Sequence, residues 1–422
     1  MCSIVEVDLS QPLPSIKVPD GRAVLVVAWL CGEPIGMSLR TSAEARSPKL
    51  LAKALNDDLG QRLAEVAERH GLPDDATVTI EGLAHADCNV RAHRQAAARD
   101  GAGISVVLCT RDRPDSLRRC LDSLLASDFH QYEVIVVDNA PATAATEQLC
   151  REYLEANPHA PMRYVLESRA GLSRARNAGV AAAKYELIAF VDDDERVERN
   201  WLTSLSVEFE ADPLVGCVSG AVLPAELDTV AQVNFEQFGG HSKGRGFERV
   251  LFDQRYLEQR QSAMYPLPPF GVGANMAFRR QALREIGGFD VALGAGTPTK
   301  GAEDTRAFSE LLLAGWRMVY CPAAVTWHYH RSDDDALVDQ LTGYGLGLGA
   351  YYAALLTRDP RRIIALLRLL PRALHDLSHP DSPRNASLGE LPPGVARANT
   401  RLLLAGPFVY WRERLRARLL PA

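Results

Sequence analysis

Largely apolar runs alternate with helical patterns through the middle of the chain. The runs at 104–108, 133–137 and 187–191 consist mostly of Val, Ile, Leu, Ala and Phe. Strands that are apolar on both faces are typical of a parallel sheet covered by helices. The segment after the first run is expected to be a helix that begins at Pro114, because proline suits the first helical position. The pattern predicts an α/β fold with a mostly parallel sheet.

The first hundred residues show a different order of elements. Apolar runs at 23–30 and 35–39 flank a Cys-Gly-Glu-Pro segment, which predicts a β-hairpin. Leucines at helical spacing follow between residues 50 and 66, and a short strand is expected at 76–80. The polar stretch 91–101, rich in Ala and Arg, is interpreted as a linker. Residues 1–100 are therefore predicted to be a small accessory α/β domain plus linker, ahead of a catalytic domain at 101–335.

Beyond Asp335 the chain is expected to be helical and is markedly basic. The arginines that give it this character are Arg358, Arg361, Arg362, Arg368, Arg372, Arg412, Arg414, Arg416 and Arg418. Leucines interleave with the first group. A solvated helical face, which we favour, and an amphipathic helix on a membrane surface both account for this pattern. Residues 336–422 are predicted to be a helical, basic C-terminal extension.

Composition narrows the class of protein. The 422 residues are 47% hydrophobic and 24% charged, as in globular proteins with a sizeable core. The formal net charge of -6 gives no general attraction to polyanions, which argues against nucleic acid as a partner. No window approaches the roughly 20 apolar residues of a membrane-spanning helix. Residues 1–19 lack the layout of a secretory signal, so no export is expected.

Eight cysteines are scattered along the chain without a CxxC pair. Several of them, such as Cys109, stand inside apolar runs. This distribution is typical of reduced core thiols rather than of a disulfide framework. We therefore expect a cytoplasmic protein, whose membrane contact, if the C-terminal helices make one, would be peripheral and at the inner face of the cell membrane.

Polar residues follow directly on each of the three apolar runs. They are Thr110, Arg111 and Asp112 after the first, Asp138 and Asn139 after the second, and Asp192, Asp193 and Asp194 after the third. Ligands bind at the carboxyl ends of the strands in open parallel sheets. The three groups are therefore expected to converge on one crevice, although a single aspartate at such a place is more often a helix cap.

The three consecutive aspartates indicate a divalent cation. If the chain stays extended, Asp192 and Asp194 share one face. Mg²⁺ or Mn²⁺ in nucleotide sites takes one or two carboxylates and completes its shell with phosphate oxygens and water. A surface acidic turn is the alternative, but such turns seldom follow directly on an apolar strand. We predict a Mg²⁺ or Mn²⁺ site beside a diphosphate.

The segment from Gly171 to Gly179 opens an Ala-rich helix ahead of the acidic strand. Arg174 and Arg176, together with the free amides of a helix N-terminus, suit an anionic diphosphate. Arginines on a solvated helix face are the alternative interpretation. Asn177 either contacts the same ligand or is a polar residue at a helix–sheet contact.

Six segments between residues 103 and 331 make the chain resemble family 2 of the inverting glycosyltransferases, which have the GT-A fold. The segments are 105–114, 136–139, 171–179, 190–194, 271–275 and 301–304. The resemblance implies a Rossmann-like sheet flanked by helices. It also implies metal-assisted transfer of a sugar, as in a hexosyltransferase, from a nucleotide-diphosphate donor to an acceptor hydroxyl with inversion. Uridine is the base that the family uses most often.

The resemblance also assigns roles to residues. Asp138 would contact the nucleotide base, Asp192 the nucleoside and Asp194 the metal. The loop near the transferred sugar would be formed around Gly273, Ala274 and Asn275. Donor contacts are also expected from Thr110, Arg111, Asp112, Arg174, Asn177 and Asp193.

Two further features concern catalysis. Glu303 and Asp304 resemble the family's acidic pair, whose second member is the base, so Asp304 is the predicted catalytic residue. Acids at a helix N-terminus also stabilise the helix dipole, which is the alternative for Asp304 taken alone. The segment 325–330 resembles a strand with a late metal-binding histidine. Alternation would place His328 and His330 on one face, and His328 is the preferred ligand.

Two rival functions are weighed against a glycosyltransferase. A sugar nucleotidyltransferase should carry a Gly-rich, Lys-containing loop after the first strand, and residues 110–114 lack one. A non-catalytic nucleotide-sugar-binding module would tolerate loss of the acidic pair, which this chain retains. The acceptor, a glycan or a lipid-linked molecule among the candidates, is not indicated, although residues 224–269 are expected to shape its site.

Overall fold

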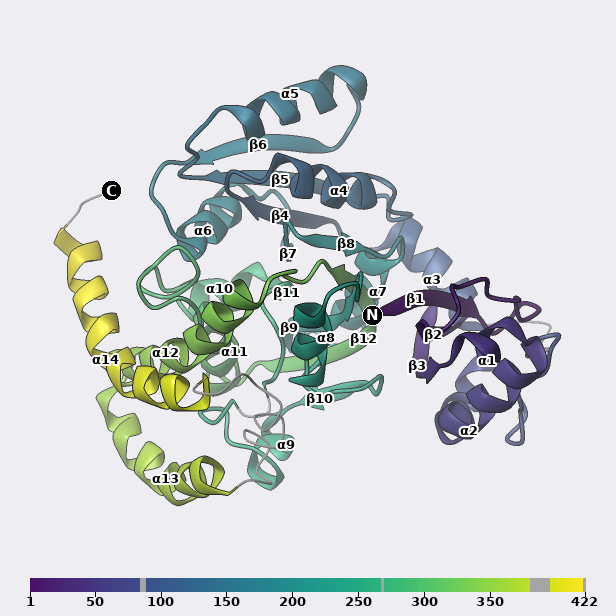
Figure 1. Ribbon diagram of the computed structural model, residues 1–422. Helices are drawn as coiled ribbons and strands as arrows, with labels where there is room; N and C mark the ends of the chain where they lie inside the picture. The colour runs from purple at the N-terminus through teal and green to yellow at the C-terminus, as the bar shows by residue number, and fades with distance from the viewer. Residues whose placement is uncertain (84–88, 267–268, 380–394, 420–422) are drawn as a thin grey trace.

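The computed structural model describes residues 1–83, 89–266, 269–379 and 395–419, and a mixed sheet forms its centre (Figure 1). Within these residues the sheet has nine strands in the order β10-β12-β9-β11-β7-β4-β5-β6, with β8 paired to β12. Four neighbouring strands are parallel: β4 (Ile104–Thr110), β5 (Tyr132–Asn139), β6 (Met162–Glu167) and β7 (Leu187–Asp192). The others are β8 (Glu195–Val197), β9 (Val215–Pro224), β10 (Val250–Phe252), β11 (Asn275–Arg279) and β12 (Arg317–His328). Because β11 runs antiparallel to both β7 and β9, the sheet is mostly but not wholly parallel.

Helices cover both faces of the sheet, as predicted. Alternate residues of β4 belong to two different hydrophobic clusters, Val106 and Leu108 to one and Val107 and Cys109 to the other. The first cluster lies under α4 (Pro114–Leu125), α5 (Ala145–Ala156) and α7 (Trp201–Ala211). The second lies under α6 (Leu172–Ala182), α10 (Arg280–Glu285) and α11 (Glu303–Leu313). Two short helices, α8 (Val230–Gln237) and α9 (Gln254–Gln259), precede the β11 strand.

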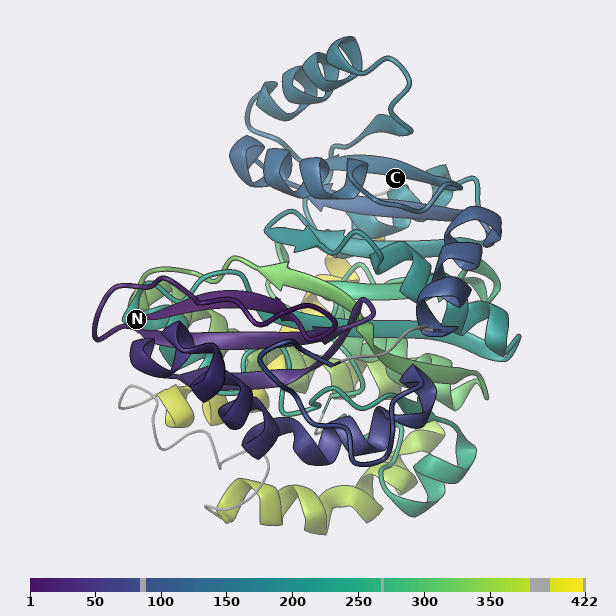
Figure 2. The same cartoon turned by 90° about the vertical axis from the view of Figure 1, so that its right-hand side faces the viewer.

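The N-terminal residues form a three-stranded sheet with helices on it, which faces the viewer in Figure 2. The strands are β1 (Cys2–Asp8), β2 (Ala23–Leu30) and β3 (Glu33–Arg40), and the helices are α1 (Ser42–Arg46), α2 (Pro48–Val66), the 3-10 turn η1 (Glu68–His70) and α3 (Asn89–Asp100). The predicted hairpin is β2–β3, and the predicted helix is α2. The unit is not independent of the main sheet, because Val27 and Trp29 of β2 belong to the same hydrophobic cluster as Phe190 and Trp327.

The structure differs from the expectations for this unit in four respects. Residues 76–80 contain no strand, only an isolated bridge between Thr79 and Gly82. The stretch 91–101 is not a linker but most of α3, since its Ala, Arg and Gln residues are strong helix formers. Strand β1 was not predicted. Cys31 is disulfide-bonded, whereas the six free cysteines among the described residues are buried, as predicted for thiols of a core.

Beyond residue 333 the described chain is helical, as predicted. It forms α12 (Asp334–Arg358), the 3-10 turn η2 (Pro360–Arg362), α13 (Ile363–Ser378) and α14 (Val395–Leu419). Helices α12 and α14 pack backbone to backbone, because a Cβ on Gly345 or Gly349 would lie 2.2 or 2.0 Å from a carbonyl oxygen of α14. Among the described residues, each helix is too short or too polar to cross a bilayer. The division into domains at residues 100 and 335 stays a prediction.

Candidate functional site

Polar groups at the ends of β4, β5 and β7 meet at one edge of the sheet. Thr110 donates a hydrogen bond from its hydroxyl to Asp193 Oδ2 (2.7 Å). Arg113 Nη1 lies 3.0 Å from a carboxylate oxygen of Asp193 and 3.0 Å from one of Asp194. Asp112 accepts a hydrogen bond from a backbone amide in the loop after β5 (2.8 Å). The convergence predicted from the three polar groups is therefore present.

The three aspartates do not continue an extended strand. β7 ends at Asp192, and the chain turns at residues 193 and 194 before β8 pairs antiparallel with β12. Asp192 Oδ1 is consequently directed at Arg176 (3.2 Å), whereas Asp194 Oδ1 faces His328 Nε2 (3.6 Å). The prediction that Asp192 and Asp194 share one face was wrong because of this turn.

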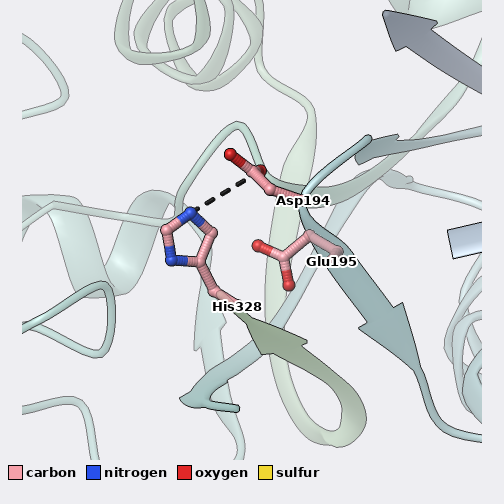
Figure 3. A group of neighbouring side chains, drawn as sticks. All are labelled: Asp194, Glu195 and His328. Atoms are coloured by element: carbon pink, nitrogen blue, oxygen red, sulfur yellow. Dashed lines mark ion pairs between the residues drawn. The ribbon is translucent and has the colours of Figure 1, made fainter. Parts of the chain in front are cut away.

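A different set of side chains gathers at the turn. Asp194, Glu195 and His328 each offer a ligand atom, and these atoms lie within 4.8 Å of one another. Figure 3 shows the two acids, consecutive in the chain, turned toward the imidazole at the end of β12. The set keeps two of the three metal ligands predicted from the sequence and replaces Asp192 with Glu195. Two carboxylates and an imidazole suit Mn²⁺ or Mg²⁺.

Glu195 is the residue that sequence reasoning passed over. Its side chain is fully buried, and neither carboxylate oxygen makes a hydrogen bond of normal geometry among the described residues. Burial raises the pKa of Glu195 well above its ordinary value, and the charge of Asp194 adds to the effect, while the nearby Thr326 hydroxyl opposes it. A buried carboxyl group without such hydrogen bonds is costly, so a cation beside it would stabilise the folded protein. The available signal was its place directly after three aspartates.

A chain of contacts extends from His328 away from the acids. His328 Nδ1 lies 2.6 Å from His330 Nδ1, and His330 Nε2 lies 2.8 Å from Glu236 Oε1 on α8. Burial lowers the pKa of His328 to about 4, although Asp194 opposes the shift. The imidazole is therefore neutral at physiological pH, which leaves a nitrogen lone pair for a metal. His330, two residues beyond the end of β12, contacts His328 rather than Asp194 or Glu195.

Arg176 connects the acidic turn with the second acidic pair. Its side chain is only 2% exposed. Nη1 donates to Glu303 Oε1 (2.7 Å), while Nη2 donates to Asp192 Oδ1 (3.2 Å) and to the carbonyl of Gly273 (3.1 Å). With these partners Arg176 is not free to bind a diphosphate, contrary to the interpretation from the sequence. Arg174, two residues earlier, is partly exposed.

Asp304 stands in the first turn of α11, next to this network. Its Oδ2 accepts a hydrogen bond from the amide of Gly273 (2.8 Å), and its Oδ1 accepts one from the amide of Thr305 (2.6 Å). A Cβ on Gly273 would lie 3.0 Å from Asp304 Oδ2, so a larger residue there would require Asp304 to shift by a few tenths of an ångström. Glu303 is buried, and burial together with the charge of Asp304 raises its pKa, while Arg176 opposes the shift. Arg176 and Gly273 thus link Asp192, at the start of the acidic turn, with Glu303 and Asp304.

The acids at the sheet edge have perturbed protonation. Burial raises the pKa of Asp192 to about 7 and that of Asp193 to about 6, and the negative charge of Asp194 adds to both shifts. Arg176 and Arg113 oppose the shifts of Asp192 and Asp193 respectively. Positive charge brought by a ligand would therefore be favourable here.

Asp138 and Asn139 differ in what they contact. Asp138 is fully buried at the end of β5, where its Oδ2 accepts from the hydroxyl of Tyr164 (3.0 Å). Its Oδ1 makes no hydrogen bond of normal geometry among the described residues; burial raises the pKa of Asp138, and the hydroxyls of Tyr164 and Thr146 oppose the shift. Asn139 instead holds the loop before α6, accepting from the amide of Gly171 (2.8 Å) and donating to the carbonyl of Arg169 (2.8 Å). Asp138 is the one with an oxygen left for a ligand.

Two predicted donor contacts serve the fold in this structure. Asn275 is fully buried; its amide nitrogen donates to two backbone carbonyls (2.8 Å each), and its oxygen accepts from the Trp201 indole (2.9 Å). Asn177 donates to the carbonyl of Phe289 (2.8 Å) and accepts from the amide of the same residue (3.0 Å). The amide groups of both residues are thus bonded within the fold. Ala274, between Gly273 and Asn275, is also buried.

A cavity of about 660 Å³ opens beside Asp194. Its walls include Asp112, Arg119, Tyr329, His330 and Arg331. The Arg119 guanidinium lies over the Tyr329 ring, 4.6 Å from its centroid. Arg331 has no ion-pair partner among the described residues and was not singled out from the sequence, although it directly follows the histidine motif. The lining also includes the acids Asp115, Asp194, Glu226 and Asp333, so Arg119 and Arg331, with Arg113, supply positive charge to a cavity that is otherwise acidic.

Residues 105–287 match the sequence model described as Glycosyl transferase family 2. This part of the chain belongs to that family. Its fold is the GT-A fold expected from the resemblance, with the parallel strands β4 to β7 inside the matched range. The acidic turn at 192–195 and the Gly273 loop of the glycosyltransferase lie within the match, whereas Asp304 and His328 lie beyond it.

The chain is also similar to proteins named as glycosyltransferases over part of its length. It is 32% identical over 116 residues to the glycosyltransferase GlyA of Streptococcus pneumoniae, covering 27% of this chain and 16% of the relative. It is 27% identical over 248 residues to the pre-mycofactocin glycosyltransferase of Mycobacterium tuberculosis, covering 58% of this chain and 47% of the relative. The chain thus matches less than half the length of either.

Solved structures resemble it more distantly. The mannosyltransferase PcManGT from Pyrobaculum calidifontis, in complex with GDP-Man and Mn²⁺, aligns with a TM-score of 0.45 at 19% identity over 76% of both chains. GalNAc-T7 with UDP, GalNAc and Mn²⁺ aligns with a TM-score of 0.42 at 16% identity, over 62% of this chain and 51% of the other.

Proposed function

We propose that this glycosyltransferase moves a hexosyl group from a nucleoside-diphosphate sugar to an acceptor hydroxyl, with inversion at the anomeric carbon. The observation that carries the proposal is the position of Arg176, whose guanidinium contacts Asp192, Glu303 and the Gly273 loop at once. A donor at the acidic turn would therefore lie close to Asp304. Neither a sugar nucleotidyltransferase nor a binding module needs a carboxylate at that place.

The residues at the turn fit a divalent cation. Glu195 supplies a buried carboxyl group without hydrogen bonds of normal geometry, Asp194 a second carboxylate and His328 a neutral imidazole. Mn²⁺ or Mg²⁺ held there would offset the charge that develops on the departing diphosphate. Glu236 and His330 would orient His328 from the far side, as second partners of metal-bound histidines commonly do.

Asp304 is the proposed base. It would accept the proton of the acceptor hydroxyl while the oxygen attacks the anomeric carbon and the bond to the diphosphate breaks. A single displacement of this kind inverts the configuration. The Gly273 and Thr305 amides fix the carboxylate from one side, and a positioned base contributes roughly 10²–10⁴-fold to the rate.

The remaining predicted contacts concern the donor. Asp138 would bind the nucleotide base through its Oδ1, after Tyr164 and α5 make room. Asp192 would contact the nucleoside. Arg331 and Arg119 are proposed to face the diphosphate in place of Arg176, because they line the cavity beside Asp194. The family resemblance makes UDP-sugars the first donors to test.

A donor panel tests the proposal. UDP-, GDP- and dTDP-sugars are to be screened by calorimetric binding and by release of the nucleoside diphosphate, with Mn²⁺ and with EDTA. We expect one donor to bind and to be turned over slowly by water, and both effects to weaken in EDTA. Binding with no turnover in the presence of sugar acceptors would favour a binding module, and full turnover in EDTA would remove the metal from the proposal.

A further inference from the structure

The outer face of α14 carries an unbroken line of exposed apolar side chains. The line consists of Leu404, Phe408, Trp411, Leu415 and Leu419, whose exposed fractions range from 52% to 77%. Separations of four, three, four and four residues place them on one stripe of a helix. Contiguous exposed apolar patches on a folded protein mark interaction surfaces.

Helix α13 repeats the arrangement. Its exposed apolar residues are Ile363, Ile364, Leu367, Leu370 and Leu374, which again recur at three or four residues. Figure 1 shows α13 and α14 along the border of the molecule away from the β1–β3 sheet. Both helices therefore lie on the same side of the protein, and each exposes an apolar stripe.

The stripes are outer faces of well-packed helices and not frayed ends. On α14 the opposite face meets α12 at glycines: a Cβ on Gly406 would lie 2.5 Å from the Leu346 carbonyl oxygen. On α13 the inward residues Leu366 and Leu369 pack on a buried cluster that contains Tyr351. The helices are thus fixed to the catalytic domain with their stripes outward.

Charge identifies the partner. Helices α13 and α14 together contain eight arginines and only two acids, in a chain of net charge -6. Asp376 is buried and accepts a hydrogen bond from Tyr265, and the Glu413 side chain is only 14% exposed. On α14 the exposed Arg401 and Arg412 lie along one border of the stripe and Arg418 along the other, at about 100° per residue.

We propose that α13 and α14 bind the surface of an anionic lipid bilayer. An apolar stripe bordered by arginines enters the boundary between headgroups and acyl chains, where the guanidinium groups meet lipid phosphates. A second copy of the chain would set arginine against arginine, because the stripes lack exposed acids. Since α12 begins at Asp334, directly after cavity residues 329–333, docking would hold the catalytic cavity at a fixed height above the bilayer. The inference does not depend on the proposed reaction.

Vesicle co-sedimentation of the full chain tests it. Binding is expected to vesicles that contain phosphatidylglycerol, weakly to phosphatidylcholine alone, and less at high salt. Leu404→Ser/Phe408→Ser/Leu415→Ser should bind at least about tenfold more weakly, since each loses a buried apolar side chain in the bilayer. The control Leu39→Ser/Leu166→Ser/Val230→Ser, which alters comparably exposed apolar residues elsewhere, should bind like the wild type.

Charge and fluorescence give independent readouts. Arg412→Gln/Arg418→Gln should weaken binding by about fivefold per arginine, whereas Lys49→Gln/Lys53→Gln on α2 should not. Of the four tryptophans besides Trp411, Trp29, Trp201 and Trp327 are buried, and Trp316 packs on the core and donates a hydrogen bond to Glu285 (2.7 Å). A blue shift on vesicle addition should therefore come from Trp411 and vanish in Trp411→Phe. No binding to anionic vesicles, or equal binding by the stripe variant and its control, would overturn the proposal. So would a wild-type dimer in sedimentation velocity that the stripe variant abolishes without any vesicle binding.

Discussion

Arg176 and Glu303 form a buried ion pair of 2.7 Å that joins α6 to the first turn of α11. The two residues are 127 positions apart in the chain. The same guanidinium also donates hydrogen bonds to Asp192 and to the carbonyl of Gly273. One side chain thus sets the distance between the acidic turn and the pair that contains the proposed base.

Replacing Arg176 by Met should destabilise the protein strongly. The variant leaves the buried Glu303 and the partly exposed Asp192 without their cation, and loss of one partner of a buried pair typically costs about 3–5 kcal/mol of unfolding free energy. Urea unfolding measures it. Arg174→Met changes a partly exposed arginine of the same helix and should shift the free energy by less than about 0.5 kcal/mol. Equal effects of the two variants would contradict the role given to Arg176.

Asp304→Asn should abolish transfer without abolishing donor binding. Loss of a positioned base is expected to lower kcat by about 10²–10⁴-fold, while the calorimetric Kd for the donor stays within a few-fold. The matched control is Asp335→Asn, which removes an acid from the first turn of α12. If both variants lose only about 0.3–1 kcal/mol of stability and keep their turnover, Asp304 is a helix-stabilising residue and not the base.

Glu195→Gln should separate metal binding from folding. The side chain is isosteric, so the metal-free protein should unfold at nearly the same urea concentration, but Mn²⁺ affinity should fall more than about 100-fold, beyond the usual effect of an outer partner. Free Mn²⁺ can be followed by electron paramagnetic resonance. The control is Asp115→Asn, which changes an acid that lines the cavity beside Asp194 but is not part of the Asp194, Glu195 and His328 group. Unchanged Mn²⁺ affinity in Glu195→Gln would exclude this residue as a ligand.

His330 should matter for the metal through His328. Replacing His330 by Phe removes the 2.6 Å contact with His328 Nδ1, and we expect Mn²⁺ affinity to fall by about 10–100-fold. Glu236→Gln should have a smaller effect in the same direction. The control is His241→Phe, since that ring packs 4.5 Å from the His328 ring without a hydrogen bond to it. A similar loss in the control would mean that the nitrogen contact between His330 and His328 is not what supports metal binding.

Stability should depend on pH through Glu33, at the start of β3. Burial alone would raise its pKa, but the hydrogen bond from His70 and the charges of Arg94 and Arg69 hold it below the ordinary 4.5. The folded state therefore binds fewer protons than the unfolded state around pH 4. The stabilisation is present above pH 4.5 and is lost as pH falls through the lower, folded value.

The measurement compares Glu33→Gln with the wild type across pH. At pH 7 the variant should be less stable by about 1–3 kcal/mol, because the carboxylate that pairs with Arg69 (2.9 Å) and Arg94 (3.3 Å) is gone. The difference should shrink as pH falls below 4.5. Glu65→Gln, which removes an exposed i,i+3 pair with Arg62, should show little difference at any pH. A difference that grows toward acid pH would contradict this account.

Sequence patterns sufficed for the strands and helices whose signals are local. The apolar runs became β4, β5 and β7, and Pro114 begins α4. Strand β1 and helix α3 were missed, the first because three of its seven residues are polar and the second because an Ala- and Arg-rich stretch reads equally as a linker or a helix. Tertiary contact decides such segments.

By itself, the sequence determined that polar groups at three strand ends share a site, because parallel strands end at the same edge of their sheet. It did not determine which carboxylates face one another. The turn after Asp192, imposed when β8 pairs with β12, brings Glu195 rather than Asp192 to His328. The sequence likewise indicated that Arg176 contacts a phosphate, whereas packing buries it against Glu303. Hydrophobic periodicity acts within one element, whereas the direction of a side chain at a turn depends on partners more than a hundred residues away.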